Sequence, residues 1–321
     1  MIFEKKIVGI YESQFLSRCD DKGLAHYFSH ADFPGLRQQP FDFKSSLGHD
    51  MKGWFYCYDE IIPGRLVVFD HGFGGGHRSY MKEIEMLARH GYLVYTYDHT
   101  GCMESGGDSP RGLSQSLRDL NDCLNALKAT PGFRDLKISV MGHSWGGFSA
   151  MNIAALHPEV THIVAMSGFV SVEEMVGQFF SGILKGYRKP VMKIEQENNP
   201  DFVKYNAAKT LADCAAKVLL IYSANDKIVI REIHHGILTK ALAGRADTRI
   251  LLEENKGHNP NYTADAAAYL AEYTAEMTRL LKDKKLNTEE EKAAFRSKWD
   301  WHRMTQQDER VWAEIFRTLD M

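Results

Sequence analysis

The chain has 321 residues, of which 44% are hydrophobic and 25% are charged, a composition typical of a globular protein with a sizeable core. Its formal net charge of −3 gives no electrostatic reason to expect binding to nucleic acid or to an anionic membrane. No apolar run approaches the ~18–20 residues that cross a bilayer. We therefore expect neither a nucleic-acid-binding protein nor a membrane-spanning one.

The cysteines and the N-terminal residues bear on cellular location. The five cysteines are odd in number, scattered and without a C-x-x-C pair: Cys19, Cys57, Cys102, Cys123 and Cys214. The first six residues, MIFEKK, do not lead into the apolar stretch of a signal peptide. We expect reduced thiols in a cytoplasmic protein and no zinc site.

The first 40 residues show no clear hydrophobic period, and Pro34-Gly35 favours a connecting region. His26 and His30 are four positions apart and could share a helix face. A metal site needs a third ligand, so we expect these histidines to be surface or packing residues.

An antiparallel hairpin is predicted next. Residues 41–45 and 52–58 are rich in aromatic side chains and flank Gly48-His49-Asp50. Such runs on either side of a glycine-containing turn are typical of two paired strands.

From residue 65 onward, strands alternate with helices. Strands are expected at 65–70, 92–97, 137–140, 161–166, 217–222 and 248–252. A helix is clearest where leucines recur at spacings of three and four: Leu113, Leu117, Leu120, Leu124 and Leu127. This alternation predicts a mostly parallel α/β sheet with helices on both faces, whose ligands gather at the carboxyl ends of the strands.

One stretch predicts a sharp strand-to-helix turn. The strand at 137–140 runs into Gly142-His143-Ser144-Trp145-Gly146, and an apolar segment with helical character follows until Pro158. Glycines on either side of a serine let the backbone adopt a strained turn next to another strand. The pattern G-x-S-x-G is short, so an incidental serine in a glycine-rich turn is the alternative.

Chemically suggestive residues follow three other strands. His71-Gly72-Phe73 follows the strand at 65–70, Asp226 follows the strand at 217–222, and His258 follows the strand at 248–252. Acyl transfer by a serine needs a base to take its proton and an acid to orient that base. Asp226 taken alone could be a turn residue and His258 a loop residue, but the order Ser144, Asp226, His258 favours a catalytic triad.

With these residues in place, the chain resembles the α/β-hydrolase family, in particular its esterase-like serine hydrolases, from about residue 41 to 281. The motifs are His71-Gly72-Phe73-Gly74-Gly75, Gly142-His143-Ser144-Trp145-Gly146-Gly147, Asn225-Asp226-Lys227-Ile228-Val229 and Gly257-His258. The resemblance implies an eight-stranded type of sheet. It also implies Ser144 as nucleophile, His258 as base, Asp226 as acid, and the backbone N–H groups of Phe73 and Trp145 as oxyanion hole.

The chain departs from the family pattern after the second parallel strand. Many relatives have Asp-x-Arg-Gly-x-Gly-x-Ser there, whereas this chain has Thr100 in place of the arginine and Met103 in place of the second glycine. Some relatives take the acid from the strand after the elbow, where Glu173 is the nearest carboxylate. We keep Glu173 as a second candidate behind Asp226.

The domain organisation follows from the resemblance and the remaining patterns. We expect one α/β-hydrolase domain over residues 1–281, with a small helical lid at about 170–210, and a C-terminal helical extension over 282–321. The lid is expected to carry one helical stripe: Met175, Val176, Phe179, Phe180, Ile183 and Leu184. Substrate-pocket candidates are His71, His143, Phe169, Phe179 and Phe180. Lys185, Arg188 and Lys189 could meet an anionic substrate or form a solvated face.

The predicted function is hydrolysis of a carboxylic ester with a short to medium acyl group, because the lid is small. A small-molecule acyl substrate is the expected partner, with no cofactor and no metal. The same triad serves peptide or amide hydrolysis and acyl transfer, so these stay open. A non-catalytic ligand-binding protein of this fold is the alternative from another class, and the sequence leaves the oligomeric state open.

Overall fold

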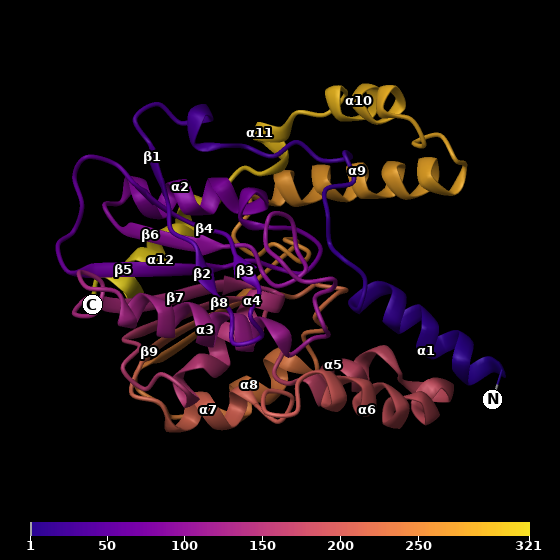
Figure 1. Ribbon diagram of the computed structural model, residues 1–321, viewed down its shortest axis with the longest axis horizontal. Helices are drawn as coiled ribbons and strands as arrows, with labels where there is room; N and C mark the ends of the chain where they lie inside the picture. Colours follow the sequence, from indigo (N-terminus) through magenta and orange to yellow (C-terminus); the bar gives the residue numbers. More distant parts are fainter. Residues whose placement is uncertain (1) are drawn as a thin grey trace.

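The computed structural model describes residues 2–321, with side chains from residue 6 onward. At its centre is an eight-stranded sheet with the order β1-β4-β6-β5-β7-β8-β9-β10 (Figure 1). The strands are β1 (Arg37–Pro40), β4 (Gly53–Cys57), β5 (Arg65–Asp70), β6 (Leu93–Tyr97), β7 (Lys137–His143), β8 (His162–Met166), β9 (Lys217–Ser223) and β10 (Thr248–Glu253). β1–β4 and β4–β6 pair antiparallel, and the other neighbours pair parallel. The predicted mostly parallel sheet is confirmed.

The central strands are buried because helices cover both faces of the sheet. In β5 every residue from Leu66 to Asp70 is buried, and in β7 every residue from Ile138 to His143 is buried. The register sets Asp70 opposite Gly142. The loop after β5 and the turn after β7 therefore leave the same edge of the sheet side by side.

Each face of the sheet has its own hydrophobic core. On one face lie α2 (Met81–Arg89) and α12 (Glu309–Leu319), which share a cluster with Val67, Phe69 and Val164. On the other face lie α3 (Gln115–Ala129), α4 (Trp145–Asn152) with η3 (Ile153–Ala155), α7 (Ala207–Asp213) and α8 (His234–Ala241). The leucine stripe predicted for α3 is buried in this second core.

The prediction of a connecting region in the first 40 residues is wrong at both ends. Residues 2–15 form helix α1 (Ile2–Phe15), in which Ile7, Tyr11 and Phe15 recur every four residues and pack on the core. Residues 37–40, expected to be a connection, form the edge strand β1. The signal for α1 was present as this short i, i+4, i+8 stripe.

The predicted hairpin is correct only at its tip. β2 (Phe43–Lys44) and β3 (Asp50–Met51) pair antiparallel as a separate two-stranded sheet. The longer arm, β4, pairs instead with β1 on one side and β6 on the other, because the main sheet satisfies hydrogen bonds along both of its edges. His26 and His30 do not share a helix: His30 begins the short 3-10 helix η1 (His30–Asp32) and His26 precedes it.

The segment between β8 and β9 is helical. It contains α5 (Val172–Phe179), η4 (Gly182–Tyr187) and α6 (Arg188–Asn198), followed by α7. The single stripe predicted here is interrupted at Ile183, which is 98% exposed, whereas Leu184 packs against the core. The chain turns at Gly182, whose φ is +58°, so Ile183 does not continue the face of α5.

The C-terminal part forms an arm above the sheet edge. α9 (Ala264–Lys282), α10 (Glu289–Ser297) and α11 (Trp301–Met304) share a third cluster built around Tyr273, Phe295 and Trp299. Thr288 and Glu291 form a capping box at the start of α10. In Figure 1 this arm projects on one side, and α1, α5 and α6 project on the other.

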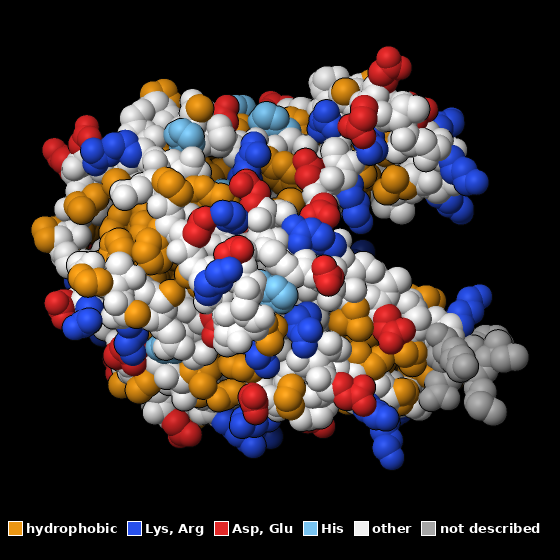
Figure 2. Space-filling model, in the orientation of Figure 1, with side chains coloured by type: hydrophobic (Ala, Val, Ile, Leu, Met, Phe, Trp, Pro, Cys, Tyr) orange, Lys and Arg blue, Asp and Glu red, His pale blue; other side chains and the backbone are white. Residues whose placement is uncertain are grey.

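Between the two projecting parts the surface is deeply hollowed, as Figure 2 shows. A cleft of about 450 Å³ is lined by residues of α1, of the segment 17–27 and of α9, and by Phe73 and Gly74 in the loop after β5. Within residues 2–321, no helix has the length and apolar character needed to cross a bilayer. The same residues contain no cluster of three or more side chains suited to hold a metal ion.

Candidate active site

Ser144 lies in a sharp turn between β7 and α4. Its backbone has φ +56° and ψ −109°, a conformation that residues with a side chain rarely adopt. A Cβ on Gly142 would lie 2.2 Å from the carbonyl oxygen of Gly146, and a Cβ on Gly146 would lie 2.0 Å from that of Asp70. Both positions therefore admit only glycine, and the surrounding backbone holds Ser144 in its strained conformation.

Two backbone amides near this turn keep unused N–H groups. The Ser144 amide donates to the Met166 carbonyl at 2.8 Å, and the Gly72 amide donates to the Tyr80 hydroxyl at 3.1 Å. The next amides along the chain, those of Trp145 and Phe73, have no acceptor among the described residues. Trp145 begins α4, so its N–H lies at the positive end of the helix dipole. These are the two amides predicted to form the oxyanion hole.

Asp226 and His258 are joined by a hydrogen bond. His258 Nδ1 lies 2.8 Å from Asp226 Oδ2, and the amides of Ile228 and Val229 donate to Asp226 Oδ1 at 2.8 and 3.1 Å. Burial would raise the pKa of Asp226, but the hydrogen bond and charge of His258 and the two amides outweigh it, so the pKa is lowered. Asp226 is thus an ionised acceptor that leaves His258 Nε2 available as a base.

His143 brings the His258 loop against the turn that carries Ser144. His143 Nε2 lies 2.8 Å from the His258 carbonyl oxygen, and the two rings are 4.7 Å apart between centroids. His143 Nδ1 lies 2.8 Å from the hydroxyl of Tyr80, which ends η2 (His77–Tyr80). Burial and the neighbouring His258 lower the pKa of His143 to about 3, so its ring is neutral. One chain of hydrogen bonds therefore runs from Gly72 through Tyr80 and His143 to the His258 loop.

The structure brings the three residues predicted to form a triad to the same edge of the sheet, with the contact between Asp226 and His258 formed. Ser144 Oγ and His258 Nε2 form no hydrogen bond to each other or to another described residue. Such contacts are often long in unliganded enzymes and tighten when substrate binds. Glu173, the second candidate for the acid, is exposed in the first turn of α5, while Asp226 occupies the position beside His258.

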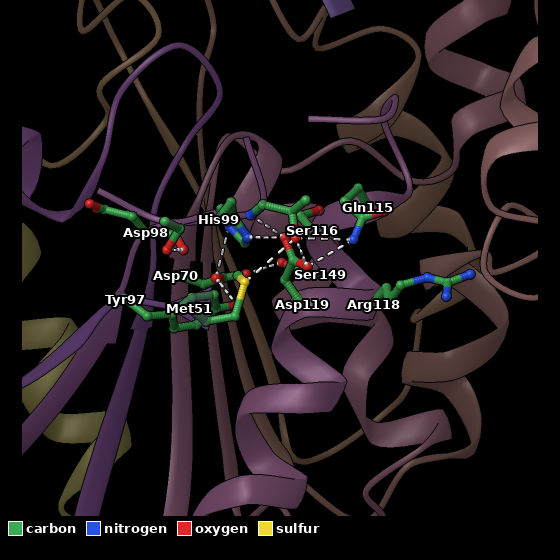
Figure 3. A network of polar contacts seen from close by, with 12 residues as sticks. Met51, Asp70, Tyr97, Asp98, His99, Gln115, Ser116, Arg118, Asp119 and Ser149 are labelled. Atoms are coloured by element: carbon green, nitrogen blue, oxygen red, sulfur yellow. Dashed lines mark hydrogen bonds and ion pairs between the residues drawn. The ribbon is translucent and has the colours of Figure 1, made fainter. Parts of the chain in front are cut away.

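A buried polar network underlies the strand ends (Figure 3). His99 follows β6 and lies between two carboxylates, with Nε2 3.0 Å from Asp70 Oδ1 and Nδ1 3.2 Å from Asp119 Oδ2. The first contact is an ion pair without hydrogen-bond alignment. Burial alone would lower the pKa of His99, but the two carboxylates raise it to about 10. All three side chains are fully buried, so the structure contains an imidazolium between two aspartates.

The same network connects, through hydrogen bonds, the loops that surround Ser144. Tyr97 donates to Asp70 at 2.8 Å, and Ser149 of α4 also donates to Asp70. Thr100, which stands where many relatives have arginine, donates through its amide (2.8 Å) and its hydroxyl (2.7 Å) to Asp119. The positive charge that the resemblance leads one to expect at position 100 is thus supplied by His99. Sequence reasoning missed His99 and Asp119, although an aspartate within the leucine stripe of α3 was a signal.

Three of the pocket candidates lie in the protein interior. His143 belongs to the hydrogen-bond chain described above. His71 is buried with Nε2 3.0 Å from the His99 amide and Nδ1 2.8 Å from the Gly72 carbonyl oxygen, and burial lowers its pKa to about 4. Phe169 stacks on Phe148 at 4.5 Å between centroids and is buried.

Phe179 and Phe180 line an apolar cavity of about 340 Å³ together with α1. Its lining residues are Ile7, Ile10, Tyr11, Gln14, Phe15, Phe179, Phe180 and Leu184. The ring of Phe15 is 5.0 Å from that of Phe73 and 5.8 Å from that of Phe179, so one residue joins this cavity to the loop after β5. α1 is therefore a wall of this region that sequence reasoning missed.

The basic residues after α5 have separate roles. Arg188 donates from Nε to the Phe180 carbonyl oxygen at 2.8 Å and from its terminal nitrogen to that of Gly177 at 2.6 Å. It thus satisfies carbonyl groups at the C-terminal end of α5. Lys185 and Lys189 are exposed.

Comparison with known proteins identifies relatives of this chain. A family model described as serine aminopeptidase, S33, matches residues 62–211. The chain is 30% identical over 115 residues to the 2-hydroxy-6-oxo-6-(2'-aminophenyl)hexa-2,4-dienoic acid hydrolase of Metapseudomonas resinovorans, across 35% of this chain and 38% of that protein. It is 35% identical over 97 residues to the AB hydrolase superfamily protein YfhM of Bacillus subtilis, across 30% of this chain and 32% of that protein. The chain thus spans about a third of the length of these curated relatives.

Solved structures share the fold. An esterase of Pyrococcus furiosus superposes with a TM-score of 0.59 at 17% identity, covering 83% of this chain and 98% of that one. The α/β hydrolase GrgF of Penicillium sp. sh18 superposes with a TM-score of 0.50 at 14% identity, covering 69% of this chain and 91% of that one. At these identities the likeness concerns the fold alone.

Proposed function

We propose that this chain, which belongs to the α/β-hydrolase family, is a serine hydrolase that cleaves carboxylic esters with short to medium acyl groups. The observation that carries the proposal is the Asp226–His258 hydrogen bond beside a serine in a strained strand-to-helix turn. If Ser144 had only a structural role, neither an ordered histidine base nor unpaired amide N–H groups would be needed beside it. The relatives are named as hydrolases, which agrees with this chemistry.

In the proposed mechanism His258 acts first as a base and then as an acid. Because Asp226 accepts from Nδ1, the lone pair of His258 lies on Nε2, and it takes the proton of Ser144 as Oγ attacks the ester carbonyl. The ester C–O bond then breaks, the acyl group stays on Ser144, and His258 passes the same proton to the departing alkoxide. Water repeats the sequence on the acyl-enzyme and releases the acid. Asp226 stays ionised and stabilises the imidazolium formed in each step.

The amides of Phe73 and Trp145 are proposed to bind the oxyanion. Charge develops on the carbonyl oxygen as Ser144 attacks, and two fixed N–H donors stabilise it without reorganising. Loss of one such donor typically costs about 3–4 kcal/mol of transition-state stabilisation. Neither amide has another acceptor among the described residues, which supports this assignment.

The apolar cavity between α1 and α5 supports an acyl or alkyl substrate. None of its lining residues is charged, and Phe15 connects it to Phe73. An acyl chain that extends from the reacting carbonyl into this cavity would gain about 0.8 kcal/mol of binding free energy for each methylene that it buries. The cavity volume of about 340 Å³ suits a short to medium chain better than a long one.

A fluorophosphonate probe tests the proposal, because it labels serine nucleophiles activated by a neighbouring base. We expect covalent labelling at Ser144 in the full-length protein and no labelling of Ser144→Ala. An unlabelled wild-type protein, or equal labelling of the variant, would contradict the proposal. An inert protein that retains a small molecule through purification would favour the non-catalytic alternative.

Amide hydrolysis is the second candidate, and one observation favours it. The 450 Å³ cleft that contains Phe73 also contains Asp20 and Asp21, carboxylates suited to an α-ammonium group. Asp20 is already paired with Arg18 at 2.8 Å, which leaves Asp21 as the freer carboxylate.

Nitrophenyl esters from acetate to decanoate, assayed beside aminoacyl nitroanilides, separate ester hydrolysis from amide hydrolysis. We expect the esters to be preferred, and a preference for anilides would assign the chain to aminopeptidases. Addition of alcohol acceptors to the same assay detects acyl transfer.

A further inference from the structure

Cys19 and Cys102 lie side by side although they are distant in sequence. They form an isolated parallel β-bridge, in which the Cys19 amide donates to the Gly101 carbonyl oxygen at 2.9 Å and the Met103 amide donates to that of Cys19 at 3.0 Å. Arg18 donates to the Met103 carbonyl oxygen at 2.5 Å and fastens the same contact. The backbones of the two cysteines are therefore held in register.

The spacing of this bridge suits a disulfide. Residues paired on neighbouring strands are about 4.7–4.9 Å apart, and disulfides join Cα atoms about 4.4–6.8 Å apart. Directly paired residues also direct their side chains to the same face. Each thiol shifts the pKa of the other, lowering that of Cys19 and raising that of Cys102, as adjacent thiols do.

The two thiols differ in access. Cys19 is half-buried and lines the 450 Å³ cleft beside Phe73 and Gly74, whereas Cys102 is fully buried. The pKa of Cys19 is lowered, because the effects of the neighbouring Cys102 thiol and the Gly74 backbone outweigh the effect of burial. An accessible sulfur of lowered pKa beside a buried second thiol is the arrangement of an attacking and a resolving cysteine.

We propose that Cys19 and Cys102 form a reversible disulfide when the protein meets a low-molecular-weight disulfide such as oxidised glutathione. The Cys19 thiolate attacks one glutathione sulfur, the glutathione S–S bond breaks, and one glutathione thiolate leaves. Cys102 then attacks Cys19 Sγ, the mixed S–S bond breaks, and the second glutathione leaves with the Cys102 proton. Two protein thiols are oxidised to one disulfide, and one glutathione disulfide is reduced to two thiols.

The disulfide would act on the entrance to the active site. Cys19 is four residues beyond Phe15 at the end of α1, and Cys102 lies in the loop after β6 that also carries His99. Joining them fixes the segment that follows α1 to the loop after β6. This inference stands without the proposed ester hydrolysis, because its test reads covalent structure.

Peptide mapping of the full-length protein tests the proposal. After incubation with oxidised glutathione, remaining thiols are alkylated under denaturing conditions and the protein is digested with trypsin. Cleavage after Arg18, Lys22, Arg89 and Arg111 places each cysteine alone in a peptide, 19–22 and 90–111. We expect these two peptides to be disulfide-linked, the link to disappear with dithiothreitol, and the melting temperature of the oxidised protein to rise by several degrees.

Variants identify the order of events. Cys102→Ser is expected to trap glutathione on Cys19, and Cys19→Ser is expected to leave Cys102 unmodified because it is buried. Cys57 and Cys214, both half-buried and without a paired thiol in the structure, are internal controls for general reactivity. The proposal is overturned if wild-type protein yields no linked peptide, or if Cys19 in Cys102→Ser reacts no faster than Cys57. Should either variant fold poorly, the wild-type map decides alone.

Discussion

The carboxyl edge of the sheet and the walls of the cleft above it are built in opposite ways. At the edge, Ser144, Asp226 and His99 lie in backbone and hydrogen-bond surroundings that leave almost no freedom. The walls come from α1 and from the helices after β8, where Ile10 is 58% exposed and Ile183 is 98% exposed. One region has close packing and buried charge, and the other has open apolar surface.

From this difference we expect the carboxyl edge to determine the reaction and the walls of the cleft to determine which substrates are preferred. The proposed triad needs its groups fixed within a fraction of an ångström, and its residues follow strands that the whole sheet holds in place. An acyl chain is recognised by apolar area, which tolerates variation in the residues that supply it. Changes at the edge should therefore abolish activity or stability, while changes in the walls should shift preference among substrates.

The largest effect is expected at Asp226. Asp226→Asn keeps the size of the side chain but favours the wrong tautomer of His258, so kcat should fall by about 10³–10⁴-fold. The measurement is steady-state hydrolysis of a nitrophenyl ester, with the melting temperature as a check on folding. Glu173→Gln, which changes the exposed second candidate, should leave kcat unchanged. A large loss in Glu173→Gln with little change in Asp226→Asn would move the acid to α5.

His99 provides the next largest effect, on stability. His99→Gln leaves Asp70 and Asp119 without their buried cation and should lower the free energy of unfolding by about 3–5 kcal/mol at neutral pH. The pKa of His99 is raised to about 10 in the folded protein from ~6.5 in the unfolded chain. Its contribution is therefore complete below pH ~6.5 and is lost as the pH rises toward the folded value.

Urea unfolding between pH 6.5 and 9 measures this contribution. The wild-type protein should lose stability over the interval by up to ~1.4 kcal/mol per pH unit, and His99→Gln should lack that part of the slope. Parallel slopes in the two proteins would mean that His99 is not charged between the two aspartates.

In the cleft walls the expected effect is smaller and depends on the substrate. Ile10→Asp places a charge on the rim of the 340 Å³ cavity without disturbing the core, because Ile10 is largely exposed. The charge should remove the binding contribution of one to two buried methylenes. The value of kcat/KM for an octanoate ester should therefore fall about 5–10-fold, whereas the value for an acetate ester should hardly change. Ile61→Asp, at a similarly exposed isoleucine before β5, is the matched control. An equal loss for both esters would contradict an acyl site at this cavity.

The same contrast explains what could be predicted from the sequence. The mostly parallel sheet followed from strand–helix alternation, and Ser144, Asp226 and His258 stood out because each lies in the turn or loop that follows a strand. His99 and Asp119 could not be paired in advance, since their contact depends on how α3 packs beside β6. α1 was missed because Ile7, Tyr11 and Phe15 form a stripe of only two turns, next to residues that show no period. Cavity walls are assembled from several such segments, and no local motif records them.

The smallest effect is expected within α1 itself, at Gly9. Gly9 is inside the helix, and a Cβ there would meet no atom within 4 Å. Gly9→Ala should therefore stabilise α1 by about 0.5–1 kcal/mol, because glycine loses more backbone entropy than alanine on entering a helix. Amide hydrogen exchange in residues 6–15 should slow by about 2–5-fold, the equivalent of that free energy, while β5 and β7 exchange as before.

If α1 opens independently of the sheet and forms a wall of the proposed acyl site, a larger folded fraction of α1 should also raise kcat/KM for the octanoate ester slightly and leave that for the acetate ester unchanged. Slower exchange across the whole sheet would instead mean that α1 unfolds only together with the catalytic edge, and the contrast between a rigid edge and a separable wall would fail.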